Sequence, residues 1–244
     1  VSEKLVDFLP GKQIVLGVNG KFHAVTPVHS IGSFHRHWGN FAHKVRALSY
    51  LLRLGKEGVP RMSSIAVLSS RYLLEKLKKN YLTLPEFAED SPRMHEFILT
   101  LSEDEFSHLE KSGIPKSQAI PQVGKLFLDF GFHAPTVAFP EIYGLMIEPT
   151  ESYSKSELDR FAQAVRAIKE IIMENPEVLK TVPHFTPIDK VDEVSANRSL
   201  VIGEIISHLP PLPFNRVKTS ILMNLTIPEI KKRILETVTG LSKG

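Results

Sequence analysis

Hydrophobic residues recur at three- and four-residue spacing in several stretches of the chain, which predicts amphipathic helices. The clearest stretch lies between Ser154 and Asn175. Ser154 and Glu157 have the spacing of a capping box, and Asn175-Pro176 is a strong stop signal. One apolar stripe follows the box: Leu158, Phe161, Val165, Ile168 and Ile172. The sequence therefore predicts one long helix between these two signals, with a single buried side.

A second helical pattern predicts a pair of helices near the N-terminus. The first runs from Asn40, a suitable N-cap, to Leu54, and Gly55 stands where a C′ glycine belongs. Pro60 favours the first turn of the second helix, which continues to Leu77. We expect a short loop containing Gly55 to join the two.

The remaining elements follow from alternation, turn residues and caps. Asn19-Gly20, between apolar residues, favours a β-hairpin with a tight type I′ turn. Other segments predict, in chain order, a strand at Met94–Leu101, a short helix after a capping box at Ser102–Glu105, a helix at Gln118–Phe130 stopped by Gly131, strands at Thr136–Phe139 and Gly144–Ile147, and a helix from Ile227 through Val238 ended by Gly240. This order predicts an α+β fold in which helices cover one face of an antiparallel sheet.

Composition narrows the class of protein. The chain has 244 residues, 42% of them hydrophobic and 23% charged, with a formal net charge of +3. These values are typical of a globular protein, and no apolar run approaches the roughly 20 residues of a membrane helix. The basic residues alternate with acidic ones, so a nucleic-acid interface is not expected. The absence of cysteine excludes disulfides and thiolate metal sites.

Short motifs in a fixed order carry a family resemblance. They are Ser30-Ile31-Gly32, Trp38-Gly39-Asn40-Phe41, Met94-His95-Glu96-Phe97-Ile98, Gly131-Phe132-His133-Ala134-Pro135-Thr136, Leu145–Ser152 and Pro183-His184-Phe185-Thr186-Pro187. Residues 1 to about 198 resemble the C-terminal region of glycine dehydrogenase (decarboxylating). This enzyme is the P-protein of the glycine cleavage system, a pyridoxal-phosphate (PLP) glycine decarboxylase. The residues after 198 match nothing in that family.

The resemblance implies the small, C-terminal domain of the PLP-dependent aminotransferase architecture (fold type I). In that family a large domain binds PLP through a lysine, and an aminomethyl group passes to a lipoyl carrier protein. The lysine follows a histidine and precedes a glycine-rich loop. The one His-Lys pair here, His43-Lys44, lies in a predicted helix. We therefore expect a lysine-bearing PLP domain or subunit as partner, in a homo- or hetero-oligomer, and PLP bound by the complete enzyme rather than by this chain alone.

The same resemblance, together with residue chemistry, selects candidate site residues. His95 and His133 are the candidate catalytic histidines, because imidazole can transfer protons near neutral pH. Arg93 can clamp a substrate carboxylate, and Thr136 is a second candidate substrate contact. Each has an ordinary structural alternative: a half-buried strand histidine, a histidine that caps a strand end, a solvated arginine and a local hydrogen bond.

Trp38, Gly39 and Asn40 are the candidate cofactor-phosphate residues, since they open a helix whose N-terminus attracts anions. The alternative is a core tryptophan followed by a plain N-cap. No metal site is expected: Arg36 separates His35 from His37, and no carboxylate lies near them. Glu148 and Glu151 are interpreted as an acidic cluster before a helix.

Three interpretations of function remain open. The first is the C-terminal part of a glycine decarboxylase, inactive alone. The second is a non-catalytic binding or regulatory module derived from that domain, and the third is an unrelated protein. Residues 1–58 would be the remnant after the PLP domain with the interdomain helix, 59–198 the small domain and 199–244 an unmatched tail. We expect a location in the bacterial cytoplasm or the mitochondrial matrix.

Overall fold

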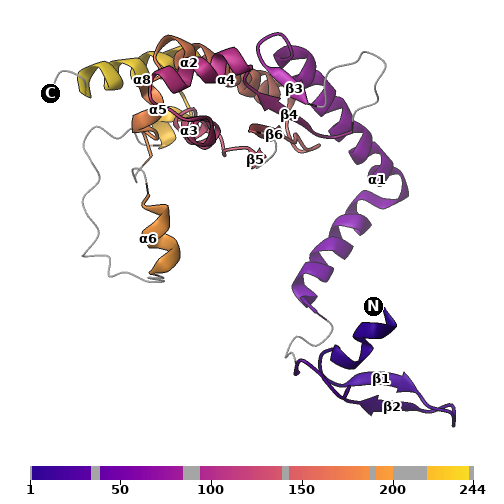
Figure 1. The fold of residues 1–244 in the computed structure, drawn as a ribbon. Helices are drawn as coiled ribbons and strands as arrows, with labels where there is room; N and C mark the ends of the chain where they lie inside the picture. Colours follow the sequence, from indigo (N-terminus) through magenta and orange to yellow (C-terminus); the bar gives the residue numbers. More distant parts are fainter. Residues whose placement is uncertain are drawn as a thin grey trace. The chain divides into compact units, whose positions relative to one another are not determined.

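The computed structural model describes residues 2–33, 39–84, 94–138, 143–186, 191–199 and 219–241. The chain divides into two compact units, Val1–Val59 and Pro60–Gly244. Figure 1 labels most of the helices and strands of both units. The expected further division at residue 198 stays a prediction.

The first unit opens with a 3-10 helix, η1 (Glu3–Phe8), and a two-stranded antiparallel hairpin, β1 (Gln13–Leu16) with β2 (Phe22–Val25). The expected hairpin is confirmed, but the expected two-residue turn is wrong. Leu16 pairs with Phe22, so residues 17–21 form the connection. The N–H of Gly20 donates to the Gly17 carbonyl at 2.9 Å, which closes this longer loop.

Helix α1 (Phe41–Leu77) contains both predicted N-terminal helices. Gly55 is the one residue at which its backbone leaves the helical conformation, with φ 65° and ψ −172°. A positive φ strains any residue with a side chain, so glycine is the residue that permits this kink. The expected loop before Pro60 is wrong, because helical structure resumes directly after Gly55 and Pro60 lies inside the second half of the helix.

The second unit contains the end of α1 and the remaining elements. They are β3 (Leu82–Leu84), β4 (Phe97–Thr100), α2 (Glu103–Lys111), α3 (Lys116–Asp129), β5 (Thr136–Ala138), β6 (Gly144–Ile147), α4 (Lys155–Glu174), α5 (Val178–Thr181), α6 (Glu193–Arg198), α7 (Thr219–Leu222) and α8 (Ile227–Leu241). The described part of this unit thus confirms the predicted order strand, helix, helix, strand, strand, helix. Strand β3 was not predicted, since its three residues are too few to show alternation.

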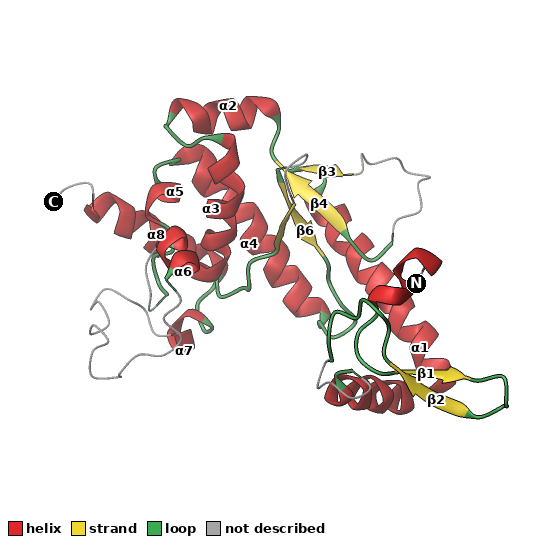
Figure 2. Cartoon of the chain, turned by 60° about the horizontal axis from the view of Figure 1, so that its bottom comes forward, coloured by secondary structure: helices red, strands yellow, loops and turns green. Residues whose placement is uncertain are grey.

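The four strands of the second unit form one antiparallel sheet in the order β3-β4-β6-β5. Figure 2 shows β4 and β6 side by side at its centre. Phe97 and Leu99 of β4, with Leu145 and Ile147 of β6, are buried and belong to the core. Side chains alternate across a strand, so these four share one face of the sheet.

Helices cover that face. Leu99 and Leu145 line a gap of about 10 Å³ together with Ile120 and Val123 of α3 and Val165 of α4. This volume is about the least that holds one water molecule, so sheet and helices are closely packed. Both expected capping boxes form, Ser102 with Glu105 and Ser154 with Glu157. The predicted α+β class with an antiparallel sheet is confirmed.

The C-terminal helix α8 packs against α4, and its side chains Ile227, Ile230 and Ile234 are buried in the same core. The expected stop at Gly240 is wrong, because the helix continues through this residue to Leu241. Val238 packs against the core just before this glycine, whose low helix propensity does not end the helix. In the described residues, no helix combines the length and the hydropathy that crossing a bilayer requires.

Candidate active-site edge of the sheet

Two of the candidate residues that the structure describes, His95 and Thr136, lie at one end of the four-stranded sheet, where β4 and β5 begin and β6 ends. His95 and Glu96 directly precede β4, and Glu148 directly follows β6. Phe97 pairs with Ile147, so Glu96 and Glu148 come next to each other in the antiparallel register. Three separate segments of the chain thus supply polar groups to this end of the sheet, which we call the sheet edge: His95 with Glu96, then Thr136, then Glu148.

The pairing register of β5 with β6 places Thr136 at the sheet edge. Thr136 pairs with Met146, and Met146 pairs with Ile98 on the other side. These three residues therefore form one row across the sheet, on the face opposite the helix-covered one. Thr136 is exposed. The row lies two residues from Glu148 along β6 and two from Glu96 along β4.

His95 contacts carboxylates. Its Nε2 lies 3.5 Å from Oε1 of Glu148 and 4.0 Å from Oε2 of Glu96. About half of each side chain is exposed, 46% for His95 and Glu96 and 53% for Glu148. Two carboxylates beside the ring give the sheet edge a negative electrostatic character. This charge disfavours binding of a substrate carboxylate beside His95.

His133 lies on the short connection between α3 and β5, after Gly131, whose φ of 79° ends the helix as expected. Its Nδ1 lies 3.0 Å from the carbonyl oxygen of the adjacent Ala134, and the side chain is exposed or nearly so. This local hydrogen bond fits the structural alternative. A catalytic role of His133 stays a prediction.

The other candidates lie at the start of α1 or outside the described residues. Asn40 precedes α1, and its carbonyl accepts the N–H groups of His43 at 3.1 Å and Lys44 at 3.4 Å, as an N-cap residue does. Gly39 directly precedes it. Trp38 and Arg93 lie outside the described residues, as do His35 and His37, so their expected roles stay predictions.

The residues present do not by themselves fit a PLP site. His43 and Lys44 lie within the first helical half of α1, not before a glycine-rich loop, which confirms the interpretation of this pair as helix-surface residues. The lysine that the family uses has no counterpart in the described part of the chain. No step of PLP chemistry is therefore derived from this chain alone.

A buried pair that the sequence reasoning missed lies near the sheet. Asp129, the last residue of α3, and His184 are buried, with side-chain exposures of 0% and 1%. His184 Nδ1 lies 2.8 Å from Asp129 Oδ2, and the Thr181 hydroxyl lies 2.9 Å from His184 Nε2. The motif around His184 was recognised in the sequence only as a family marker. Nothing in the spacing of positions 129 and 184 indicates that they meet.

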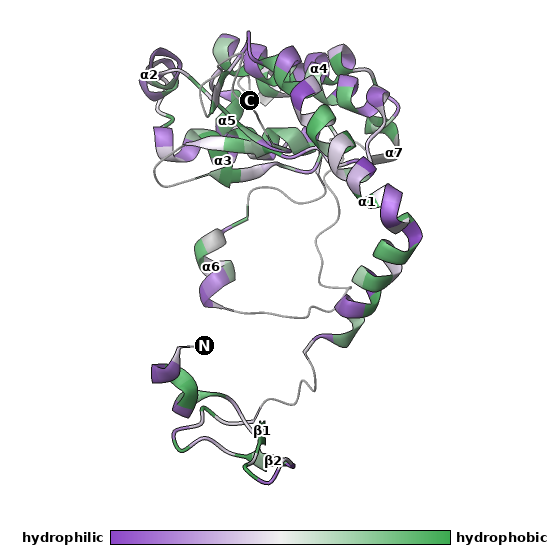
Figure 3. Ribbon diagram, turned by 90° about the vertical axis from the view of Figure 1, so that its right-hand side faces the viewer, coloured by the Kyte–Doolittle hydropathy of each residue, from purple (hydrophilic) through white to green (hydrophobic). Residues whose placement is uncertain are grey.

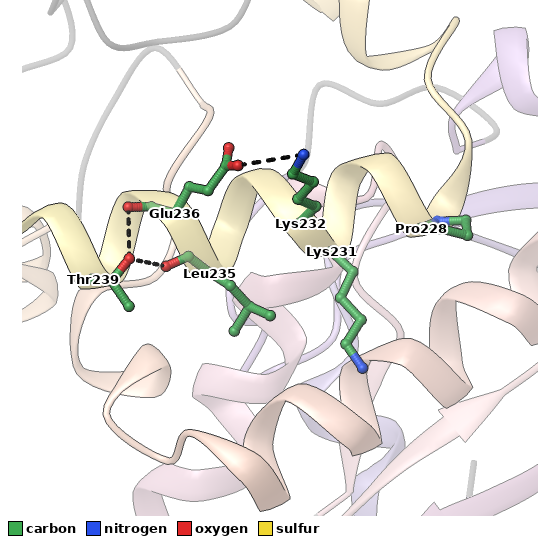
Figure 4. A pocket seen from close by; sticks show the side chains of 6 residues that line it. All are labelled: Pro228, Lys231, Lys232, Leu235, Glu236 and Thr239. Carbon is green, nitrogen blue, oxygen red and sulfur yellow. Dashed lines mark hydrogen bonds and ion pairs between the residues drawn. The ribbon is translucent and has the colours of Figure 1, made fainter.

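A shallow depression of about 370 Å³ lies on α8 and is drawn in Figure 4. Lys231, Leu235, Glu236 and Thr239 line it, with Pro228 and Lys232. Lys231 pairs with Glu170 of α4 at 2.7 Å, and Lys232 pairs with Glu236 at 3.8 Å. The first contact joins α8 to α4 and the second lies within α8, and the depression holds none of the candidate site residues.

The fold and the sheet edge define a C-terminal α+β domain that carries polar groups at one end of its sheet. Residues 62–184 match the family described as "Glycine dehydrogenase, C-terminal domain". The chain therefore belongs to this family, and the interpretation as an unrelated protein is wrong.

Curated relatives agree with the family. The chain is 41% identical over 204 residues to the probable glycine dehydrogenase (decarboxylating) subunit 2 of Caldanaerobacter subterraneus, a match that covers 83% of this chain and 39% of the relative. The protein of the same description in Chlorobium chlorochromatii is 40% identical over 206 residues, covering 83% of this chain and 40% of the relative. That of Thermotoga maritima is 38% identical over 204 residues, covering 82% and 40%. The chain thus spans about two fifths of the length of these relatives.

Proposed function

We propose that this chain is the C-terminal part of a glycine dehydrogenase (decarboxylating) that works in glycine cleavage. The proposal rests on the family match over residues 62–184. Sequence identities of 38–41% to the curated relatives, over most of the chain, support it. The antiparallel sheet with helices on one face agrees with the small domain of the PLP-dependent aminotransferase architecture. The proposed location is the cytoplasm of a bacterium, or the mitochondrial matrix in a eukaryote.

The cofactor and its lysine come, in this proposal, from polypeptide outside the 244 residues. About three fifths of each relative lies outside the match, which leaves room for a PLP-binding domain. When bound, PLP supplies the electron sink for carbanion chemistry, and protein groups orient it. The proposed partners are this lysine-bearing domain or subunit and a lipoyl carrier protein that accepts the aminomethyl group.

This chain contributes, in the proposal, groups that close over the substrate. The proposed substrate contacts are Arg93 and Thr136. The proposed proton-transfer residues are His95 and His133. Trp38, Gly39 and Asn40 are proposed to approach the cofactor phosphate, since Asn40 opens α1 and a helix N-terminus attracts anions.

The first unit supports the need for a partner. It exposes large apolar side chains, including Phe22 at 73%, Phe41 at 69% and Leu52 at 74%. Figure 3 shows hydrophobic residues repeating along the first half of α1. Stable proteins rarely leave extended apolar surface in water. We propose that the lysine-bearing domain covers this surface, because the relatives contain enough additional chain to do so.

Complex formation tests the proposal. The portion of the Caldanaerobacter relative outside the match is purified with PLP and mixed with this chain. We expect the two to elute together, and the absorbance of a protein-bound PLP Schiff base to persist through the column. Lys44→Ala should leave that absorbance unchanged, because Lys44 belongs to a helix and is not the Schiff-base lysine.

Phe22→Ser in this chain should weaken the complex, because it removes an exposed apolar contact of the first unit. Met223→Ser is the matched control, since Met223 is 69% exposed but belongs to the second unit. The proposal would be contradicted if the two chains eluted separately while the intact relative retained PLP under the same conditions. That result would favour the non-catalytic module.

A further inference from the structure

The sheet edge brings three potential metal ligands together. One ligand atom from each of His95, Glu96 and Glu148 lies within 4.8 Å of the other two. The three side chains come from two strand ends that are about fifty residues apart in sequence, and the pairing of Phe97 with Ile147 unites them. The sequence did not predict this metal site, because only the histidines around Arg36 are close together along the chain.

The two carboxylates meet as a consequence of the fold. Glu96 and Glu148 occupy the positions next to the last pair of the β4–β6 ladder. Like charges placed opposite each other on neighbouring strands destabilise a sheet. A positive charge between them removes this repulsion. The imidazole of His95 lies 3.5 Å and 4.0 Å from the two carboxylates, so a cation bound between them would also be within reach of its Nε2.

We propose that His95, Glu96 and Glu148 bind a divalent transition-metal ion, for which Zn²⁺ is the best fit. One imidazole nitrogen and two carboxylate oxygens are ligands that Zn²⁺ accepts. Three protein ligands leave a fourth tetrahedral position for water. The partial exposure of all three side chains gives the ion a path into the site.

The distances require little rearrangement. Zinc bonds to nitrogen and oxygen of about 2.0–2.1 Å place tetrahedral ligands roughly 3.3–3.4 Å apart. The His95–Glu148 separation of 3.5 Å already agrees with this value, and the His95–Glu96 separation of 4.0 Å must shorten by less than about 1 Å. The two glutamate oxygens, which lie within 4.8 Å of each other, must also approach.

Zinc titration of the full 244-residue chain, treated first with a chelator and followed by calorimetry, tests the proposal. We expect a saturable site that is lost or weakened at least about tenfold in His95→Ala and in Glu148→Gln, since even residues that only support metal ligands contribute about 10- to 100-fold to affinity. Cobalt in place of zinc should give a tetrahedral absorption band that His95→Ala abolishes. Thermal unfolding without metal checks that each variant is folded.

His108→Ala is the matched control, because His108 is exposed and its Nε2 lies 3.0 Å from the Met173 carbonyl, away from the three ligands. Its zinc affinity should equal that of the parent chain. Absence of a saturable site would overturn the proposal. Equal affinity in the parent chain, His95→Ala and Glu148→Gln would also overturn it and place zinc elsewhere. The measurement needs neither PLP nor glycine, so its outcome is independent of the family assignment, and a saturable site would make His95 a ligand in place of its proposed proton-transfer role.

Discussion

The Asp129 carboxylate at the end of α3 holds the backbone of His184 in place. Its Oδ1 accepts hydrogen bonds from the N–H groups of His184 at 2.7 Å and Phe185 at 2.8 Å, and its Oδ2 lies 2.8 Å from the His184 ring. Both side chains are buried. The pair thus connects α3 to the segment that follows α5.

Asp129→Ala should destabilise the protein strongly, because it leaves the N–H groups of two residues and a buried imidazole without their acceptor. Removing one partner of a buried pair costs about 3–5 kcal/mol. Urea unfolding measures the loss. The control is Glu177→Gln, which breaks an exposed pair with Lys180 and should cost less than about 1 kcal/mol. Similar losses in the two variants would contradict the role of Asp129.

Two glycine substitutions should have opposite effects on stability. A Cβ at Gly144 in β6 would lie 2.5 Å from Ile98 Cγ2 and 2.9 Å from the Leu99 carbonyl oxygen. Gly144→Ala should therefore cost about 1–3 kcal/mol through overpacking.

Gly124→Ala is the matched variant within α3, where the nearest atom, Ala134 Cβ, lies 3.8 Å away. It should stabilise the protein by up to about 1 kcal/mol, because alanine is the better helix former. Chemical unfolding of both variants provides the comparison. If Gly124→Ala lowered the free energy of unfolding as much as Gly144→Ala does, the packing around these residues would differ from that described above.

Ser154→Ala should destabilise α4 by about 1 kcal/mol, since it removes the N-cap that accepts the Glu157 N–H at 3.3 Å. The melting temperature measures the effect. Ser156→Ala, which removes a hydroxyl 3.0 Å from the Ser154 Oγ but leaves both members of the capping box in place, should lower it far less. Equal decreases would mean that the capping box does not contribute to stability.

Acid should weaken the attachment of α1 to α4. The hydrogen bond from Lys155 is the main cause that lowers the pKa of Asp159, and Tyr72 and Lys76 of α1 add to it. A carboxyl group with a lowered pKa stabilises the fold above its ordinary pKa of about 3.9, and this contribution is lost as the pH falls through the lowered value.

Asp159→Asn should therefore lower the melting temperature at pH 7, and the difference from the parent chain should shrink under strongly acidic conditions. Thermal unfolding at a series of pH values follows the difference. A difference in melting temperature between the two proteins that stays constant down to the most acidic pH would contradict the ionic role of Asp159.

The sequence predicted those features that depend on neighbouring residues. Ser154 and Glu157 are three residues apart, so the capping box can be recognised without knowledge of the fold. The antiparallel arrangement followed from the order of elements. The sequence predicted a helix end and a loop at Gly55, whereas the structure has a kink there and helix beyond it, because a glycine at a helix end and one at a kink have the same local signal.

The site required tertiary information. Glu148 meets His95 only because β6 pairs with β4 in one register, and a shift of one residue would turn these side chains to the other face. Asp129 and His184 likewise come together through packing of α3 against α5. Family resemblance selected His95 and His133 without indicating the acidic surroundings of His95.

Glycine-dependent release of CO2 is the most direct measurement of the proposed function. The Caldanaerobacter relative, truncated to the portion outside the match, is assayed with PLP and a lipoylated carrier protein, with and without this chain. We expect no release from either polypeptide alone and restored release from the mixture. A mixture as inactive as its components, while the intact relative is active in the same assay, would contradict the assignment of this chain as the C-terminal part of a glycine dehydrogenase.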